Sequence, residues 1–497
     1  MTGLAGGATF SETGPIWTTH KGKGNDLMKG FMVPLATLTN FVLFSSATTA
    51  EPILRPWKEN PWYWSYHGEP ILLLGGSDDD NLFQWPQKAL VDQLDRLARA
   101  GGNVIRNTMS DRKDQGFEIY PFKQLDGGLY DLNVWNEEYW QRFERMLFRT
   151  SEHHILVQIE IWDRFDYSDM NGSGRWHIHP YNPANNVNYT YDQSGFAARY
   201  PDHPGANKQP FFFTTPHQRN NQVVLPYQQR FVNKLLNHTL KYDHVLYCMD
   251  NETNGEEEWS RFWAEFVGEK AAKQNKTVYL TEMWDDWNLT AERHKRTFDH
   301  PDLYGFVDVS QNNHNKGQKH WDNFLHVRDY LASQPRPMNT TKTYGAAGNK
   351  FGHTDQDGIE RFWRHLLAGA ASMRFHRPDS GLGLNNKAVA CIHAARQLES
   401  LLPLWSVEPA NELLSDRQDN EAYAATDGGG RTYIVYFPSG GEVRFDLSEA
   451  SGILTIQWIN IDTGQSEPQG CLSGGSQISL SPPGKENWVA AILTPHN

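Results

Sequence analysis

The middle of the chain alternates short β-rich runs with segments of helical periodicity, and this alternation restricts the possible fold more than any other feature. Alternation of this kind is typical of parallel βαβ units. The eight expected strands span residues 71–75, 103–108, 155–162, 244–250, 277–283, 304–310, 336–344 and 372–376. Eight strands, each followed by a helix, predict an α/β fold of the (β/α)8 TIM-barrel type. The alternative is an open doubly wound sheet, but no glycine-rich phosphate loop follows the first strand to support it.

The segments between these strands carry apolar faces at helical spacing. In the first segment, Leu90, Leu94 and Leu97 fall on one face, and Gly101 and Gly102 end the helix. Further helices are expected at 136–150, 226–242, 256–274, 320–333, 357–370 and 385–402.

After Pro403 the pattern changes to short strands separated by clusters of Gly, Ser, Pro and Asp. Strands are expected at 432–437, 442–447, 454–460 and 488–493. This spacing predicts a small C-terminal antiparallel β-sandwich. We therefore expect an N-terminal extension and signal peptide at 1–50, a TIM-barrel catalytic domain at 51–403 and a β-sandwich domain at 404–497.

The N-terminal region contains a Met-Lys-Gly sequence at 28–30, an apolar stretch at 31–44 and then small residues up to Ala50. This order is typical of a secretory signal peptide, so we expect secreted or periplasmic protein that begins near Glu51. The alternative is a buried core helix. No other apolar run approaches the roughly 20 residues that span a bilayer, so no membrane partner is expected after signal removal.

Composition excludes several classes of partner. The formal charge of −13 and the absence of any Lys/Arg run argue against nucleic acid. Cys248, Cys391 and Cys471 are too few and too scattered for a disulfide framework or a four-ligand zinc site, and we expect no cofactor or metal. The 18 Trp, 20 Tyr and 25 Phe residues instead supply an unusual amount of aromatic surface.

The chemistry of a TIM barrel lies at the carboxyl ends of its strands. In this chain those ends carry carboxylates, amides, imidazoles and indoles, namely Glu160, Trp162, Asp163, Asp250, Asn251, Glu252, Glu282, Trp284, Asp285, Asp308, Asn312, His314, Arg374, His376 and Arg377. Aromatic faces stack on the C–H surfaces of sugars, and amides and carboxylates bond their hydroxyls. The strand ends therefore predict a carbohydrate site.

The Asn251–Glu252 pair at the end of the fourth strand is the most informative motif. It resembles the acid/base pair of clan A glycoside hydrolases, in which the Glu protonates the leaving glycosidic oxygen and the Asn contacts the sugar. Cleavage needs such a donor because an alkoxide is a poor leaving group. The alternative is a structural cap for the next helix.

The resemblance extends to bacterial proteins with a DUF4038-type catalytic domain and a C-terminal "collagen-binding" sandwich, which include apiosidase-like glycoside hydrolases. The matching pieces are Gly68-Glu69-Pro70 with Leu73-Leu74-Gly75, the segment 366–371, the segment 431–438 with Gly440 and Gly441, and Trp458-Ile459-Asn460 with Thr463-Gly464. Their order covers nearly the whole expected mature chain. The resemblance implies a barrel that acts on carbohydrates.

The seventh strand departs from that pattern, because Lys342 lies where clan A enzymes carry the nucleophilic Glu. We expect Glu282 to supply the second carboxylate, because neighbouring parallel strands lie about 4.8 Å apart and Glu282 ends the strand next to that of Glu252. Asp163 and Asp308 are the substitutes if an inverting distance is needed. Otherwise Glu282 only holds an Arg or a His.

Other residues at the strand ends are expected to contact the substrate. Trp162 and Trp284 end strands, whereas Trp259 and Trp263 have helical spacing and are expected in the core. The remaining expected contacts are Asn251, Asp163, His314, Lys342, Tyr344, Arg374 and His376. The acidic run 78–80 could bind a sugar or calcium or have only a structural role.

Three functions fit these observations. The first is an exported glycoside hydrolase that acts at the end of a plant or algal poly- or oligosaccharide. The second is a non-catalytic glycan-binding protein on a hydrolase scaffold, for which Lys342 is the main evidence. The third is a polysaccharide lyase with Lys342 or Tyr344 as base and Arg374 and Arg377 on a uronate. The positive charge of Lys342 also predicts a preference for acidic substrates. The sequence does not determine the oligomeric state.

Overall fold

The computed structural model describes residues 52–109, 115–170, 175–349 and 351–495. All of these residues belong to one compact unit of the chain. The expected N-terminal extension and signal peptide at 1–50 lie outside the described residues.

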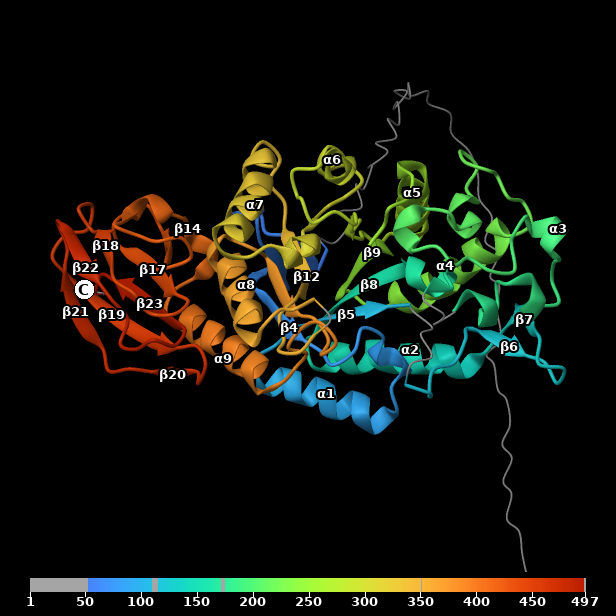
Figure 1. Ribbon diagram of the computed structural model, residues 1–497, viewed down its shortest axis with the longest axis horizontal. Coiled ribbons are helices and arrows are strands. Elements are labelled where there is room, and N and C mark those ends of the chain that lie inside the picture. The colour runs from blue at the N-terminus through green and yellow to red at the C-terminus, as the bar shows by residue number, and fades with distance from the viewer. Residues whose placement is uncertain (1–51, 110–114, 171–174, 350, 496–497) are drawn as a thin grey trace, which may run out of the picture. The chain divides into compact units, whose positions relative to one another are not determined.

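The centre of the structure is one sheet of eight parallel strands (Figure 1). In chain order its strands are β4 (Leu73–Gly76), β5 (Val104–Thr108), β8 (Leu156–Asp163), β9 (Val245–Asn251), β10 (Leu280–Thr281), β11 (Val307–Asp308), β12 (Met338–Thr343) and β13 (Ser372–Phe375). The spatial order is β10-β9-β8-β5-β4-β13-β12-β11, so the sheet curls until β13 pairs with β4. The two ends of this order meet where the Asp308 amide donates to Thr281 Oγ1 at 3.1 Å. This arrangement confirms the predicted barrel.

Helices lie between the barrel strands along the chain, and the longer ones cover the outer side of the sheet (Figure 1). They are α1 (Gln87–Arg99), α2 (Glu137–Glu152), α3 (Tyr191–Ser194), α4 (Leu225–Thr239), α5 (Glu257–Ala272), α6 (Glu292–Phe298), α7 (Gly317–Tyr330), α8 (Asp355–Leu367) and α9 (Asn386–Leu401). The sequence predicts all of these except α3 and α6. Those two helices are too short for a periodic apolar face to be recognised.

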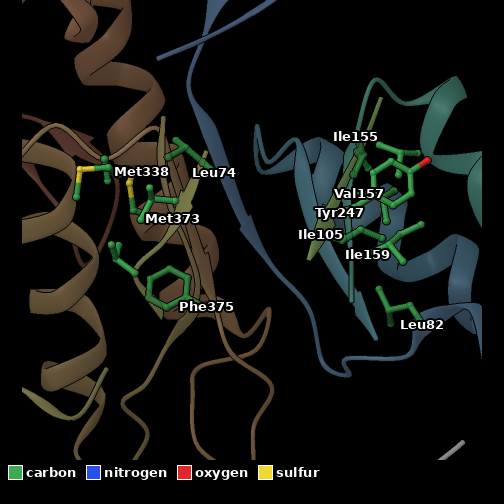
Figure 2. Packing of buried hydrophobic residues seen from close by; sticks show 14 of the residues in the cluster. Leu74, Leu82, Ile105, Ile155, Val157, Ile159, Tyr247, Met338, Met373 and Phe375 are labelled. Atoms are coloured by element: carbon green, nitrogen blue, oxygen red, sulfur yellow. The ribbon is translucent and has the colours of Figure 1, made fainter. Parts of the chain in front are cut away.

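Alternating residues of the barrel strands pack in two separate apolar groups, as the period of two in a strand requires. Leu73, Val104, Leu156 and Leu246 belong to one small cluster with Trp64, which lies on β2. Their strand neighbours belong to the main cluster, which includes the helices. Figure 2 shows two groups of these neighbours, Leu74 with Met338, Met373 and Phe375, and Ile105 with Ile155, Val157, Ile159 and Tyr247.

The barrel interior becomes polar toward the carboxyl ends of the strands. Gln158 Nε2 donates to Asp308 Oδ2 at 2.9 Å, which joins β8 to β11. Near the start of β12, at the opposite end of the barrel, Asn339 accepts a 3.0 Å hydrogen bond from the indole of Trp64. Trp64 lies in a small antiparallel sheet made of β1 (Leu54–Pro56), β2 (Trp64–Tyr66) and β3 (Glu69–Ile71). The interior therefore has an apolar layer below the charged residues of the site.

The C-terminal residues form antiparallel sheets, as predicted after Pro403. One sheet contains β14 (Glu408–Pro409), β16 (Tyr423–Thr426), β17 (Thr432–Phe437), β23 (Trp488–Leu493), β19 (Ile453–Asn460), β20 (Gln465–Ser466) and β21 (Gly470–Ser473). The other contains β15 (Leu414–Ser415), β18 (Val443–Asp446) and β22 (Gln477–Leu480). One apolar cluster takes residues from both sheets, including Val435 of β17 and Phe445 of β18.

The larger C-terminal sheet also packs on the barrel helices. Tyr436 of β17 belongs to the main apolar cluster, and its ring lies 5.8 Å from that of Trp363 on α8. Gln356 on α8 exchanges two amide hydrogen bonds with Asn487, at 2.8 and 2.9 Å.

A hairpin of β6 (Phe122–Gln124) and β7 (Tyr130–Trp135) is inserted between β5 and α2. None of the helices in the described ranges is both long and apolar enough to cross a membrane.

Candidate active site

Two cavities lie at the carboxyl ends of the barrel strands. The smaller cavity has a volume of about 190 Å³ and is lined by Asp80, Arg106, Phe165, Ser168, Met170, Arg175, Asn251, Glu252, Lys342, Tyr344, His376, Arg377, Asp379 and Ser380. The larger cavity has a volume of about 880 Å³ and is lined by Phe165, Met170, His203, Glu252, Asp285, Trp287, Gln311, His314, Lys316, Tyr344, Phe351 and His353. Four residues belong to both walls, namely Phe165, Met170, Glu252 and Tyr344. The two cavities are therefore neighbours that meet at Glu252.

The backbone at Glu252 is fixed in an unusual conformation. Glu252 follows the last residue of β9 and has a φ of +54°, in the left-handed region that non-glycine residues seldom adopt. The next residue, Thr253, donates its amide to the Met283 carbonyl at 2.8 Å and accepts from the Asp285 amide at 2.9 Å. These bonds tie the end of β9 to the segment after β10. The side chain of Glu252 is thereby turned toward the cavities instead of continuing the strand.

Lys342 on β12 determines the charge state of Glu252. Its ammonium Nζ lies 2.5 Å from Glu252 Oε1, and the Gln311 amide donates to the same oxygen at 3.3 Å. Burial alone would raise the pKa of Glu252, but the charge and hydrogen bond of Lys342 outweigh burial and lower this pKa to about 2. Glu252 is therefore a carboxylate at neutral pH.

Asn251 links this ion pair to a second group of charges. Its side-chain oxygen accepts from Lys342 Nζ at 2.6 Å and from Arg106 Nη2 at 2.8 Å. Arg106 also pairs with Glu160 at 2.6 Å and with Asp80 at 3.0 Å, and all of these groups are buried. Asn251 is thus a bridge that fixes the direction of both cations.

Asp80 at the floor of the smaller cavity is surrounded by cations. Burial raises its pKa, but Arg106, His376, Arg374 and Arg377 together hold it well below the usual range. Arg374 Nη2 lies 3.0 Å from its carboxylate, and Arg377 Nε lies 3.4 Å away. Asp80 is therefore ionised and already neutralised.

Asp285 is the second carboxyl group in the wall of the larger cavity. Burial and then the negative charge of Glu252 raise its pKa above the usual value. Its Oδ2 accepts a short hydrogen bond from Asn254, whose own oxygen accepts from Arg293 at 2.5 Å. The carboxyl group is thus held in place without a cation directly on it.

Aromatic side chains form much of the larger cavity. Trp287 is 59% exposed, more than any other Trp in the described ranges. The rings of Tyr344 and Phe351 stack with their centroids 5.2 Å apart, and His314 meets Tyr344 edge-on at 5.3 Å. Ring faces and edges of this kind suit the C–H surfaces of a sugar chain.

The structure brings some of the predicted site residues together at the cavities. Asn251, Glu252, Lys342, Tyr344 and His376 line the smaller cavity, and His314 lines the larger one. Trp287 was not predicted, although it follows the strand end by only a few residues. The signal for it is the Trp-Asp-Asp-Trp run at 284–287, whose first Trp, Trp284, is one of the predicted contacts.

Other predicted contacts do not line either cavity. Trp162 is 1% exposed and packs against Trp259 and Trp263, with ring centroids 5.9 and 5.2 Å away. Trp284 is buried and donates its indole N–H to Thr297 Oγ1 at 2.8 Å. Both indoles fill the space between the strand ends and the helices, where burial of a large ring is most favourable.

The expected second carboxylates also lie behind the cavity walls. Glu282 is buried, and its Oε1 accepts backbone amides of Asp250 and Met283 at 3.0 and 2.9 Å. Asp163 accepts from the Phe165 amide at 3.0 Å, and Asp308 accepts from Ser310 at 2.8 Å. Each carboxylate holds the backbone at a strand end, which keeps it from reaching into the cavity.

Arg374 and Tyr344 have contacts that bear on lyase chemistry. Arg374 is buried on Asp80 and on the Thr341 carbonyl at 2.8 Å, and it does not line the smaller cavity. Burial raises the pKa of Tyr344 well above its usual value, so its hydroxyl stays protonated and is a poor base.

Within the described part of the chain, no cluster of three or more His, Cys, Asp or Glu residues could hold a metal ion.

Comparisons with known proteins agree with this fold. Neither the profiles of known protein families nor curated protein sequences give a match. The structure is similar to that of a family 5 glycoside hydrolase from Bacteroides vulgatus, with a TM-score of 0.59 and 12% identity over 88% of this chain and 92% of that one. A second solved structure, described as a glycoside hydrolase, has a TM-score of 0.60 and 12% identity over 89% of this chain and 97% of its own. At this identity the likeness establishes the fold, a TIM barrel of the kind that these glycoside hydrolases have.

Proposed function

We propose that this protein hydrolyses a glycosidic bond at the end of a carbohydrate chain, with Glu252 as a catalytic carboxylate. The observation that carries this proposal is that Glu252 belongs to the walls of both cavities. A substrate that extends from one cavity into the other places a bond beside this carboxylate. The likeness in fold to glycoside hydrolases supports the same conclusion.

The two cavities fit the two sides of such a substrate. The smaller cavity, about 190 Å³, is lined with charged groups and suits the terminal sugar and its hydroxyls. The larger cavity carries Trp287, Tyr344 and Phe351 and suits the rest of the chain. This difference favours release of sugar from a chain end over cleavage inside a chain.

Glu252 is suited to act as a base. The sequence comparison implies that this residue is a proton donor, whereas the Lys342 ion pair keeps it ionised before the reaction. An ionised carboxylate takes the proton of the water molecule that attacks the anomeric carbon, as in inverting glycosidases. The ammonium of Lys342 keeps this carboxylate in one orientation.

We also propose the finer features that the sequence predicts. These are export after removal of the segment that ends near Ala50, a plant or algal poly- or oligosaccharide as substrate, and an apiosidase-like relationship. The preference for acidic substrates stays a prediction. Arg175 and Arg377, which line the smaller cavity and keep some exposure, are better placed than the buried Lys342 to meet an acidic group.

A non-catalytic glycan-binding protein is the second candidate. The observation that favours it is the ion pair of Lys342 with Glu252, at the strand end where the related enzymes carry a nucleophile. Such a protein would bind an oligosaccharide across both cavities and leave it intact.

The test compares the native protein with Glu252→Gln on a panel of oligosaccharides. We expect the native protein to release reducing sugar and the variant to lose about 10²–10⁴-fold in kcat, because the amide cannot take a proton. Oligosaccharide affinity, measured by calorimetry, should change only a few-fold. Glu258→Gln on the exposed surface of α5 is the matched control and should behave like the native protein.

One outcome contradicts the hydrolase function, and another contradicts the role of Glu252. Binding without release of sugar by the native protein would identify the glycan-binding candidate instead. Full activity of Glu252→Gln would exclude Glu252 as the catalytic carboxylate.

A further inference from the structure

We propose that Asp285 is the proton donor to the leaving group and that it works as a pair with Glu252. This inference rests on the proposed glycoside hydrolase function. It assigns a catalytic role to a residue outside the predicted pair of Glu252 and Glu282.

The ion pair at Glu252 creates the need for a second group. Hydrolysis of an unactivated glycoside requires an acid that protonates the departing oxygen. Glu252 is a carboxylate with Lys342 Nζ 2.5 Å from its Oε1, so it has no proton to give before the reaction. The acid must therefore be another group at the same cavity.

Asp285 is fixed beside Glu252 through the backbone. Thr253 and Trp284 form a parallel β-bridge, and Glu252 and Asp285 adjoin the two residues of this bridge. Glu252 precedes Thr253 and Asp285 follows Trp284, so the two residues are diagonal across the bridge. With strands about 4.8 Å apart and a rise of about 3.3 Å per residue, their backbones lie roughly 8 Å apart, which lets both side chains reach one cavity. Both residues line the larger cavity. The geometry therefore places a second carboxyl group on the side of Glu252 where the leaving group would lie.

The surroundings of Asp285 differ from those of the other carboxylates at the cavities. Asp80 is paired with Arg106 and Arg374, and Asp379 is paired with Arg377 at 3.0 Å. Asp285 has no ion-pair partner among the described residues, and its side chain accepts from the neutral amide of Asn254. Burial and the charge of Glu252 raise its pKa, and together they exceed the opposing effects of the Asn254 hydrogen bond, Lys342 and His203. Among these three, Asp285 is the carboxyl group whose environment favours the protonated form.

Asp285 and Glu252 act together in one hydrolysis step. Asp285 transfers its proton to the glycosidic oxygen while the bond from that oxygen to the anomeric carbon breaks and its electron pair moves to the oxygen. Glu252 takes a proton from water, and the water oxygen forms the new bond to the anomeric carbon. The products are an alcohol and a free sugar, with Asp285 left ionised and Glu252 protonated. Proton exchange with solvent restores both groups.

The leaving group of the substrate tests this assignment. A 2,4-dinitrophenyl glycoside departs without protonation, whereas an alkyl glycoside of the same sugar needs the acid. We expect Asp285→Asn to lose about 10²–10⁴-fold in kcat on the alkyl glycoside and less than tenfold on the dinitrophenyl glycoside. Glu252→Gln should lose activity on both. Asp286→Asn, one residue along the same loop and outside both cavity linings, is the matched control and should retain activity on both.

A second variant separates catalysis from structure. The Asn254 hydrogen bond lowers the pKa of Asp285, so Asn254→Ala should move the alkaline limb of the rate profile to higher pH. In Asp285→Asn the alkaline limb should be absent on the dinitrophenyl glycoside. Equal losses on the two glycosides, an unchanged Asp285→Asn, or an unmoved limb in Asn254→Ala would overturn the assignment. If the native protein cleaves neither glycoside, the proposed hydrolase function itself fails.

Discussion

The Lys342–Glu252 pair joins a buried ammonium to a carboxylate that is 17% exposed, and both members also make neutral hydrogen bonds. Lys342 Nζ is bonded to Asn251, and Glu252 accepts from Gln311. Burial of two charges is unfavourable unless such additional bonds satisfy them, and removal of one partner then costs about 3–5 kcal/mol. The pair is therefore both a structural contact and the device that keeps Glu252 ionised.

Lys342→Met should raise the pKa of Glu252, because burial is then no longer opposed by the ammonium. In the native protein the stabilising effect of the pair is fully present above the ordinary pKa of Glu, about 4.3, and is lost as the pH falls through about 2. We expect the acid limb of the rate profile to move from near pH 2 to above pH 4.3, and the stability at pH 7 to fall by about 3 kcal/mol. Rate profiles and urea unfolding measure the two effects.

Lys273→Met on the exposed surface provides the control for loss of one positive charge. An acid limb that stays near pH 2 in Lys342→Met would show that Lys342 does not determine the ionisation of Glu252.

The place of a single residue in the site could be predicted only where its position on a strand determines the direction of its side chain. Asn251, Glu252 and Lys342 lie at or next to the ends of strands whose sequence limits were clear, and they do meet. Trp284 and Trp287 lie beyond such a limit, where the path of the loop decides which indole is buried. Composition and spacing contain no information on that path.

At the level of elements, the positions of the strands could be predicted more accurately than the number of residues that each strand pairs by hydrogen bonds. The expected run at 277–283 contains β10, which is only Leu280–Thr281, and the run at 304–310 contains β11, which is only Val307–Asp308. Apolar residues show which part of a strand packs in the core. The hydrogen-bonded pairing, in contrast, ends where the adjacent strand turns away. Short helices such as α6 were missed because seven residues carry too few apolar positions for a period to be seen.

The contact between α8 and the segment just after β12 depends on glycine. Gly345 has a φ of +136°, and a Cβ there would lie 2.1 Å from the backbone nitrogen of Gly358. Gly345→Ala should therefore destabilise the protein by more than about 4 kcal/mol in urea unfolding, because backbone atoms cannot move aside as a side chain can. Gly348 has a φ of +76°, and a Cβ there would have no atom within 4 Å. Gly348→Ala therefore measures the cost of the backbone conformation alone.

Gly348→Ala should cost about 1–2 kcal/mol. If the two variants lose equal stability, the close approach of β12 to α8 is not the reason for glycine at position 345.

At the scale of the whole molecule, the barrel and the C-terminal sheets share apolar contacts. Tyr436 and Val489 belong to the same cluster as the barrel helices, so neither part would keep its buried surface if the other unfolded. We expect one calorimetric transition for the described residues, with equal calorimetric and van't Hoff enthalpies. Two separated transitions would contradict this coupling. The division at 403/404 into two domains stays a prediction.

The left-handed backbone at position 252 also affects which substitutions are expected at this position during evolution. Among the residues that the structure describes, the other non-glycine residues with positive φ are His67, His154, Asn207, Asn220, Asn275, Asp416 and Asn420, residue types that tolerate this region. A Glu in the same region has no such tolerance, and the conformation costs about 1–3 kcal/mol. Neutral drift toward Asn or Gly would relieve this strain, so a lineage that no longer used the carboxylate would be expected to lose it. The strain at Glu252 therefore predicts that relatives which use this carboxylate keep Glu at this position, whereas relatives that do not use it carry Asn or Gly.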